Sequence, residues 1–120
     1  MSGAPLPVID PRPLQDLLEM GAEPGLVGEL IGLLEGDFPT RLASLRKALE
    51  ASDKEAALPE AHQLKGALGT LGLPRFADLV RQLEGHLREG RWEEARRLLG
   101  TFPAAYQEAV TALRAAFPET

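Results

Sequence analysis

The spacing of leucines between residues 24 and 50 constrains the fold more than any other feature. Apolar side chains recur there at three- and four-residue intervals, at Leu26, Leu30, Leu33, Leu34, Phe38, Leu42, Leu45 and Leu49. Such intervals place side chains along one face of an α-helix. The segment therefore predicts a long amphipathic helix that must bury one face against other helices. Pro39 lies inside the pattern, so we expect a kink near Gly36 to Phe38.

Other segments carry helical periodicity or helix start and stop signals. Asp10 is an acidic N-cap before Pro11, and Gly21 ends the short helix that they begin. Longer helices are predicted over residues 53–71, 74–89 and 91–117, the last with a kink or brief break at Pro103. No stretch alternates between apolar and polar residues as a strand would, so the predicted fold class is all-α.

The connections between the long helices are short, which makes successive helices antiparallel neighbours. We therefore expect an antiparallel up-down four-helix bundle with a short extra N-terminal helix, spanning residues 10–118. Residues 1–9 contain two prolines and a glycine and show no periodicity, so they are expected to form a flexible N-terminal tail.

Composition excludes several kinds of function. The chain has no cysteine, which rules out disulfides, thiolate metal sites and a cysteine nucleophile. Its net charge of −5 argues against nucleic acid as a partner, because phosphate backbones require a concentrated basic surface. We see no secretory signal and no apolar run long enough to span a membrane. The expectation is a cytoplasmic monomer that binds neither nucleic acid nor membrane.

The predicted helix over residues 53–71 has two different faces. On a helical wheel with about 100° per residue, one arc is apolar and predicted to be buried: Ala57, Ala61, Leu64, Leu68 and Leu71. His62 and Lys65 lie on the opposite arc. Gly66 and Gly69 share that arc, and Leu58 joins it one turn before the histidine. Glycine lets another backbone approach closely. The pattern suits a transient negative group on His62 and a partner protein that docks over Leu58, Gly66 and Gly69.

A carboxylate is expected beside this histidine. His62 lies eleven residues before Leu73, in the predicted turn, and Glu84 lies eleven residues after it. In an antiparallel pair of helices these positions have about the same height. Glu84 can then accept a hydrogen bond from one imidazole nitrogen and leave the other as an outward nucleophile. Arg81 and Gln82 are less well placed for this role.

The motif H-x-x-K-G from His62 to Gly66, a glycine ten residues after the histidine, and a Leu-Glu pair ending at Glu84 resemble the histidine-containing phosphotransfer (HPt) domain family. The resemblance covers about residues 10 to 117. Two positions depart from the pattern. Ala67 stands where many members have serine, and Pro59 precedes the histidine by three residues.

The resemblance implies a phosphorelay intermediate of a two-component system. His62 would accept a phosphoryl group from a receiver-domain aspartate, or from a sensor or hybrid histidine kinase, and pass it to a response-regulator aspartate. Lys65 would balance the phosphoryl charge, Gly66 would leave room for the receiver, and Glu84 would orient the imidazole. Mg²⁺ would belong to the receiver, so this chain would need no cofactor and would be a covalent carrier rather than an enzyme.

Other interpretations follow from the same residues. A module that docks receiver domains as a scaffold or sequestering partner, without carrying phosphate, stays open as an alternative. A metal site is not predicted, because His62 and His86 lack partners at ligand spacing. No glycine-rich nucleotide-binding loop lies between a strand and a helix. His86 is interpreted as a partly exposed structural residue.

Overall fold

All regular secondary structure within residues 6–118, the part of the chain that this computed structural model describes, is α-helical. The prediction of an all-α fold is therefore confirmed for these residues. Within this range six helices follow one another: α1 (Arg12–Glu19), α2 (Pro24–Glu50), α3 (Lys54–Thr70), α4 (Pro74–Arg88), α5 (Trp92–Leu99) and α6 (Phe102–Ala116).

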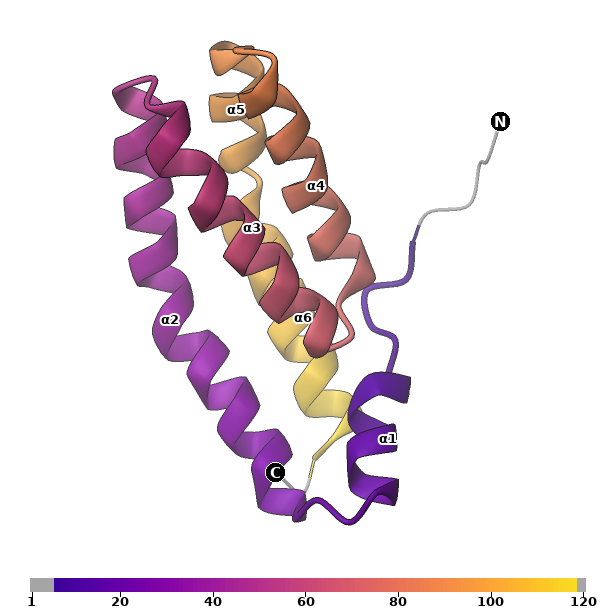
Figure 1. Ribbon diagram of the computed structural model, residues 1–120. Coiled ribbons are helices and arrows are strands. Elements are labelled where there is room, and N and C mark those ends of the chain that lie inside the picture. Colours follow the sequence, from indigo (N-terminus) through magenta and orange to yellow (C-terminus); the bar gives the residue numbers. More distant parts are fainter. Residues whose placement is uncertain (1–5, 119–120) are drawn as a thin grey trace.

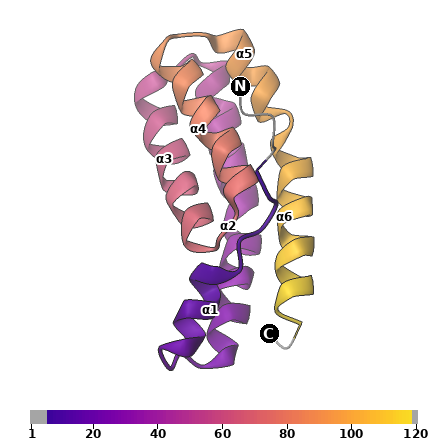
Figure 2. The ribbon, with the colours of Figure 1, turned by 90° about the vertical axis from the view of Figure 1, so that its right-hand side faces the viewer.

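The long helices lie lengthwise beside one another and alternate in direction. In Figure 1, α2 rises, α3 returns, α4 rises again, and α5 and α6 together run back down. The last helix is broken at Gly100 and Thr101, just before Pro103, as the sequence predicts. Figure 2 shows the same order from the side. The axis of α2 bends near its middle, where Pro39 lies inside the helix. Because α3 packs against both α2 and α4, only one of its faces points away from the other helices.

The helix ends follow the predicted signals, with one correction. Asp53 caps α3 by accepting a hydrogen bond from the backbone N–H of Ala56, at 3.1 Å. Helix α1 begins one residue later than expected, at Arg12, with Pro11 in the N-cap position. Asp10 still makes a capping contact, because its Oδ1 accepts a hydrogen bond from the backbone N–H of Arg12, at 3.1 Å. Asp10 also donates its backbone N–H to the carbonyl of Gly72 in the α3–α4 turn.

The buried face of α2 differs from the predicted one in its first half. Val27 and Ile31 are fully buried, whereas the predicted core residue Leu33 is 67% exposed. Leu26 and Leu30 are only partly buried. Further along, the predicted residues do form the core: Leu34, Phe38, Leu42, Leu45 and Leu49. Residues 26–34 are apolar around most of the helix, so spacing alone does not identify the inner face.

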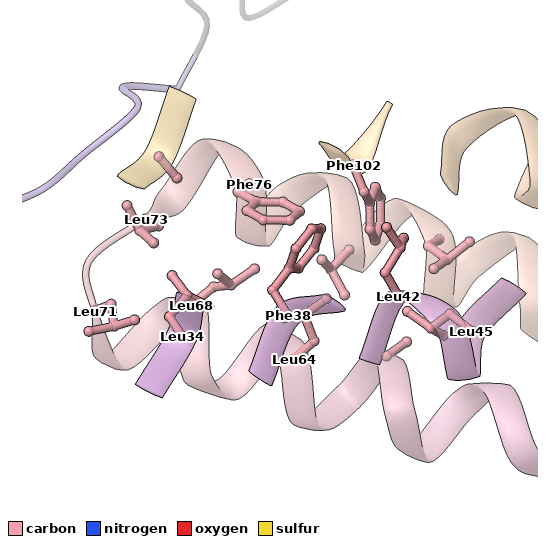
Figure 3. Close-up of a cluster of buried hydrophobic side chains, with 14 of the residues drawn as sticks. Leu34, Phe38, Leu42, Leu45, Leu64, Leu68, Leu71, Leu73, Phe76 and Phe102 are labelled. Atoms are coloured by element: carbon pink, nitrogen blue, oxygen red, sulfur yellow. The ribbon is translucent and has the colours of Figure 1, made fainter. Parts of the chain in front are cut away.

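Aromatic side chains from three helices meet in the middle of the core. Phe76 of α4 lies edge-on to Phe38 of α2, with ring centroids 5.9 Å apart, and edge-on to Phe102 of α6, at 5.4 Å. Figure 3 shows these rings above Leu64 and Leu68 of α3. The apolar arc of α3 is buried as predicted. Its packing holds the opposite arc away from the core.

The segment before α1 lies against the beginning of α4. Arg75 donates its backbone N–H to the carbonyl of Pro7, at 3.2 Å, and its Nε to the carbonyl of Leu6, at 2.9 Å. The expected flexible tail at residues 1–9 therefore includes residues that make specific contacts. Residues 1–5 lie outside the described part of the chain.

Replacing Gly72 by alanine is expected to destabilise the fold. Gly72 has a φ of +73°, and a Cβ there would lie 2.1 Å from the backbone oxygen of Asp10. We expect the free energy of unfolding, measured with urea, to fall by about 1–3 kcal/mol or more. Gly36→Ala is the matched control, because a Cβ at Gly36 meets open space inside α2. The control should be as stable as the unaltered protein or more so, and equal stability of both variants would contradict this account.

Candidate functional site

His62 lies on the outward arc of α3, as the helical wheel predicts. Its side chain is 72% exposed, while Ala61 and Leu64 beside it in the sequence are buried. Lys65 follows one turn later and is partly exposed. The packing of α3 thus presents an imidazole and an ammonium group together at the surface.

Glu84 of α4 reaches His62 from the neighbouring helix. Its Oε2 lies 3.3 Å from Nδ1 of His62, at the long end of hydrogen-bonding distances. An ionised carboxylate only accepts hydrogen bonds, so Nδ1 carries the hydrogen in this contact. In the neutral ring the lone pair is then on Nε2. The predicted contact between His62 and Glu84 is present, and it leaves the lone pair of the neutral ring on Nε2.

The Glu84 carboxylate is surrounded by cations. It is 1% exposed and is the only fully buried charged side chain among residues 6–118. The Nζ of Lys65 lies 2.5 Å from Oε1, and the Nη2 of Arg88 lies 3.6 Å from Oε2. Apart from its ion pair with Lys65, Oε1 has no hydrogen-bond partner within the described chain. A buried charge is tolerated only with such partners.

Opposing effects set the pKa of Glu84. Burial by itself raises the pKa, because it disfavours the charged form. The hydrogen bond and charge of Lys65, the hydrogen bond of His62 and the charge of Arg88 outweigh this effect. The pKa of Glu84 is therefore held below the usual value of a glutamate, and the carboxylate stays ionised at neutral pH.

The three predicted docking residues all lie on α3, with different exposure. Gly66 and Gly69 are exposed, and a Cβ added at either would meet nothing within 4 Å. Nothing within the described chain therefore requires glycine at these positions, although each glycine costs the helix about 1 kcal/mol relative to alanine. Leu58 is partly buried against the core, so only part of its side chain can contact a partner.

Arg88 also belongs to the site, although it is not among the residues predicted from the sequence. Its spacing of four residues from Glu84 on one helix is a signal that could have found it. The less well placed alternatives, Arg81 and Gln82, do not join the site. Both donate to Asp78, at 2.8 Å, one turn before them on α4.

A second missed feature is an apolar groove between α2 and α3, with a volume of about 610 Å³. Its lining includes Leu30 and the exposed Leu33 of α2, and Ala67 of α3, which follows Gly66 in the sequence.

Within residues 6–118 no three acidic or histidine side chains come together as metal ligands. In the same range, no helix has the length and apolarity that a bilayer span requires.

The ion pairs of Glu84 predict a pH-dependent stability. Because the folded pKa is lowered, their contribution is complete above the ordinary glutamate pKa of 4.5 and is lost as the pH falls through the folded pKa. Glu84→Gln should lower the free energy of unfolding by about 1–3 kcal/mol at pH 7. In urea unfolding at several pH values, this difference should shrink below pH 4.5.

Glu89→Gln is the matched control, since Glu89 pairs with Arg91 at the surface. It should change the free energy of unfolding by less than about 0.5 kcal/mol. A Glu84→Gln difference that stays constant between pH 7 and pH 3 would contradict the ion-pair account.

Comparisons with known proteins agree with this geometry. The crystal structure of histidine-containing phosphotransfer protein B (HptB) from Pseudomonas aeruginosa PAO1 is similar, with a TM-score of 0.78 and 26% sequence identity, over 95% of this chain and 97% of that one. No curated protein sequence matches. The sequence model of the Hpt domain matches residues 29–116, which is most of the chain. The chain therefore belongs to the Hpt domain family, whose members are phosphotransfer intermediates in two-component signalling.

Proposed function

We propose that His62 is the phosphoacceptor of a phosphorelay. The observation that carries the proposal is the exposed imidazole whose Nδ1–H is directed at the buried Glu84 carboxylate. This arrangement leaves the Nε2 lone pair accessible, with the Lys65 ammonium one turn away. Membership of the Hpt family supports the same role.

The transfer step needs no base and no proton from solvent. The lone pair of Nε2 forms the N–P bond while the P–O bond to a receiver aspartate breaks, and the bonding electrons return to the aspartate carboxylate. The ring then carries a phosphoryl group on Nε2 and a hydrogen on Nδ1. The negative charge of Glu84 faces the positive charge that the ring acquires. Transfer to a second receiver reverses these bond changes.

The partners of this step are receiver domains and a sensor or hybrid histidine kinase. Phosphoryl transfer depends on positioning and charge stabilisation. In this proposal the receiver supplies its own Mg²⁺, and this chain acts as a covalent carrier without a cofactor. It would do so as a cytoplasmic monomer in which α2, α3, α4 and the α5–α6 pair form the four-helix bundle.

The docking face is proposed to extend from α3 onto α2. The cleared surface at Gly66 and Gly69 would admit the receiver loops that surround its aspartate. The apolar groove with Leu33 lies beside this surface, because Ala67 of its lining is next to Gly66. Exposed apolar grooves of this kind mark protein interaction sites.

The central experiment incubates the chain with phosphorylated receiver domains, or with a cognate kinase and ATP. We expect an acid-labile, alkali-stable label that disappears in His62→Gln. His86→Gln is the matched control and should keep the label, because His86 Nδ1 accepts from Arg91 and lies outside the site. No label with a full panel of partners would favour the alternative, a module that only docks receivers. A label that persists in His62→Gln would refute the assignment.

Gly66→Leu should slow phosphoryl transfer at least tenfold without destabilising the chain. The added side chain meets open space within the protein and replaces a poor helix former. It would, however, occupy the proposed docking face. Gly25→Leu is the control, since Gly25 is equally open but lies in the first turn of α2. Transfer rates and thermal unfolding measure the two effects. Normal transfer by folded Gly66→Leu would contradict docking over this glycine.

A further inference from the structure

Lys65 is already engaged in the structure, which raises a problem for its proposed role. Its Nζ lies 2.5 Å from Oε1 of Glu84, so at least one of its three N–H donors is directed at that buried carboxylate rather than at a phosphoryl group. A phosphoryl group on Nε2 of His62 would bring up to two negative charges to the surface of α3. Lys65 is one helical turn away on a flexible stem and can turn towards it. Such a turn would draw Nζ away from Oε1 of Glu84 and weaken that ion pair.

The departure of Lys65 would make the buried charge of Glu84 energetically unfavourable. The carboxylate is almost completely buried, and Oε1 has no other partner within the described residues. Removing one partner from a buried charge is strongly unfavourable. The Nδ1–H of His62 would remain on Oε2, but the lost positive charge must come from another side chain.

Arg88 is placed to supply that charge. It lies one turn after Glu84 on α4, and its Nη2 is 3.6 Å from Oε2, just outside hydrogen-bonding distance. Its side chain is 60% exposed, so it has room to move. A guanidinium can hold a carboxylate through two parallel hydrogen bonds. The site therefore has one buried anion and two cations at different distances from it.

We propose that Arg88 is a positioning residue that takes over Glu84 when Lys65 turns to the phosphoryl group on His62. The exchange changes ion pairs only and makes or breaks no covalent bond. It rests on the proposed function, because it requires His62 to be phosphorylated. Glu84 thereby opposes the phosphorylated state by retaining Lys65, and Arg88 weakens that opposition.

The lifetime of phosphohistidine in three variants tests this exchange. Without Arg88, Glu84 retains Lys65 more strongly, so Arg88→Gln should shorten the lifetime. Exposed ion pairs contribute modestly, which corresponds to about a two- to fivefold change. Glu84→Gln removes the hold on Lys65 together with the charge that faces the ring, so it serves as the background in which the Arg88 effect is tested. In the Glu84→Gln background, Arg88→Gln should have no further effect, because the group through which it acts is gone.

The test loads the full chain with phosphoramidate, a small-molecule phosphoryl donor that needs no partner protein. ³¹P NMR then follows the loss of phosphohistidine at pH 8 in the unaltered chain, both single variants and the double variant. Arg81→Gln is the matched control, since it removes an exposed arginine of α4 that pairs with Asp78. Its lifetime should be unchanged. Thermal unfolding confirms that each variant is folded.

A second measurement reports directly on Lys65. The ¹⁵Nζ resonance of Lys65 should change on phosphorylation in the unaltered chain and change less in Arg88→Gln. Two results would overturn the proposal: an unchanged lifetime in Arg88→Gln, or an Arg88→Gln effect of equal size with and without Glu84. The latter would mean that Arg88 contacts the phosphoryl group itself. The phosphoramidate experiment involves no receiver. A failure of transfer between this chain and receivers would therefore not change the Arg88 result, and an unchanged lifetime in Arg88→Gln would not change the result of the receiver experiment.

Discussion

The charge of one buried carboxylate, that of Glu84, must be balanced by neighbouring groups, and this requirement determines which side chains meet at the site. Glu84 lies where α4 packs against α3, and burial would make its charge unfavourable without partners. The partners that lower its pKa are His62, Lys65 and Arg88, and these are the groups that face solvent at the site. The groups that stabilise the buried charge of Glu84 are therefore the same groups that are proposed to take part in phosphoryl transfer. The same contact that stabilises the helix pair also fixes which imidazole nitrogen is left free.

The scaffold explains why this contact can form. The apolar arc of α3 is held by leucines and by the aromatic cluster of Phe38, Phe76 and Phe102, which leaves His62 no inward orientation. The α3–α4 turn closes on Gly72, whose positive φ and close approach to Asp10 exclude other residues. This turn sets the heights at which residues of α3 and α4 face one another. The register between α3 and α4 therefore determines that His62 and Glu84 face each other.

Much of this could be predicted from the sequence, and the exceptions have physical reasons. The two faces of α3 differ sharply in polarity, so a helical wheel places His62 outward. The equal spacing of His62 and Glu84 from Leu73 then predicts their pairing across two antiparallel helices. Residues 26–34 are apolar nearly all round, so the same method misplaced Leu33 in the core. Asp10 donates its backbone N–H to Gly72, a tertiary hydrogen bond that no local pattern encodes. The spacing of Arg88 from Glu84 was a local signal, but such pairs are common on helices, and the burial of Glu84 that makes this one important appears only after packing.

A single measurement can decide which nitrogen of which histidine carries the phosphoryl group. Two-dimensional ¹H–¹⁵N–³¹P NMR of the phosphorylated chain distinguishes the two phosphohistidine isomers. With Glu84 holding Nδ1–H, we predict one phosphoryl signal, coupled to Nε2 of His62. A phosphoryl group on Nδ1 of His62, or on His86, would contradict the account, because it would mean that the buried carboxylate does not direct the chemistry.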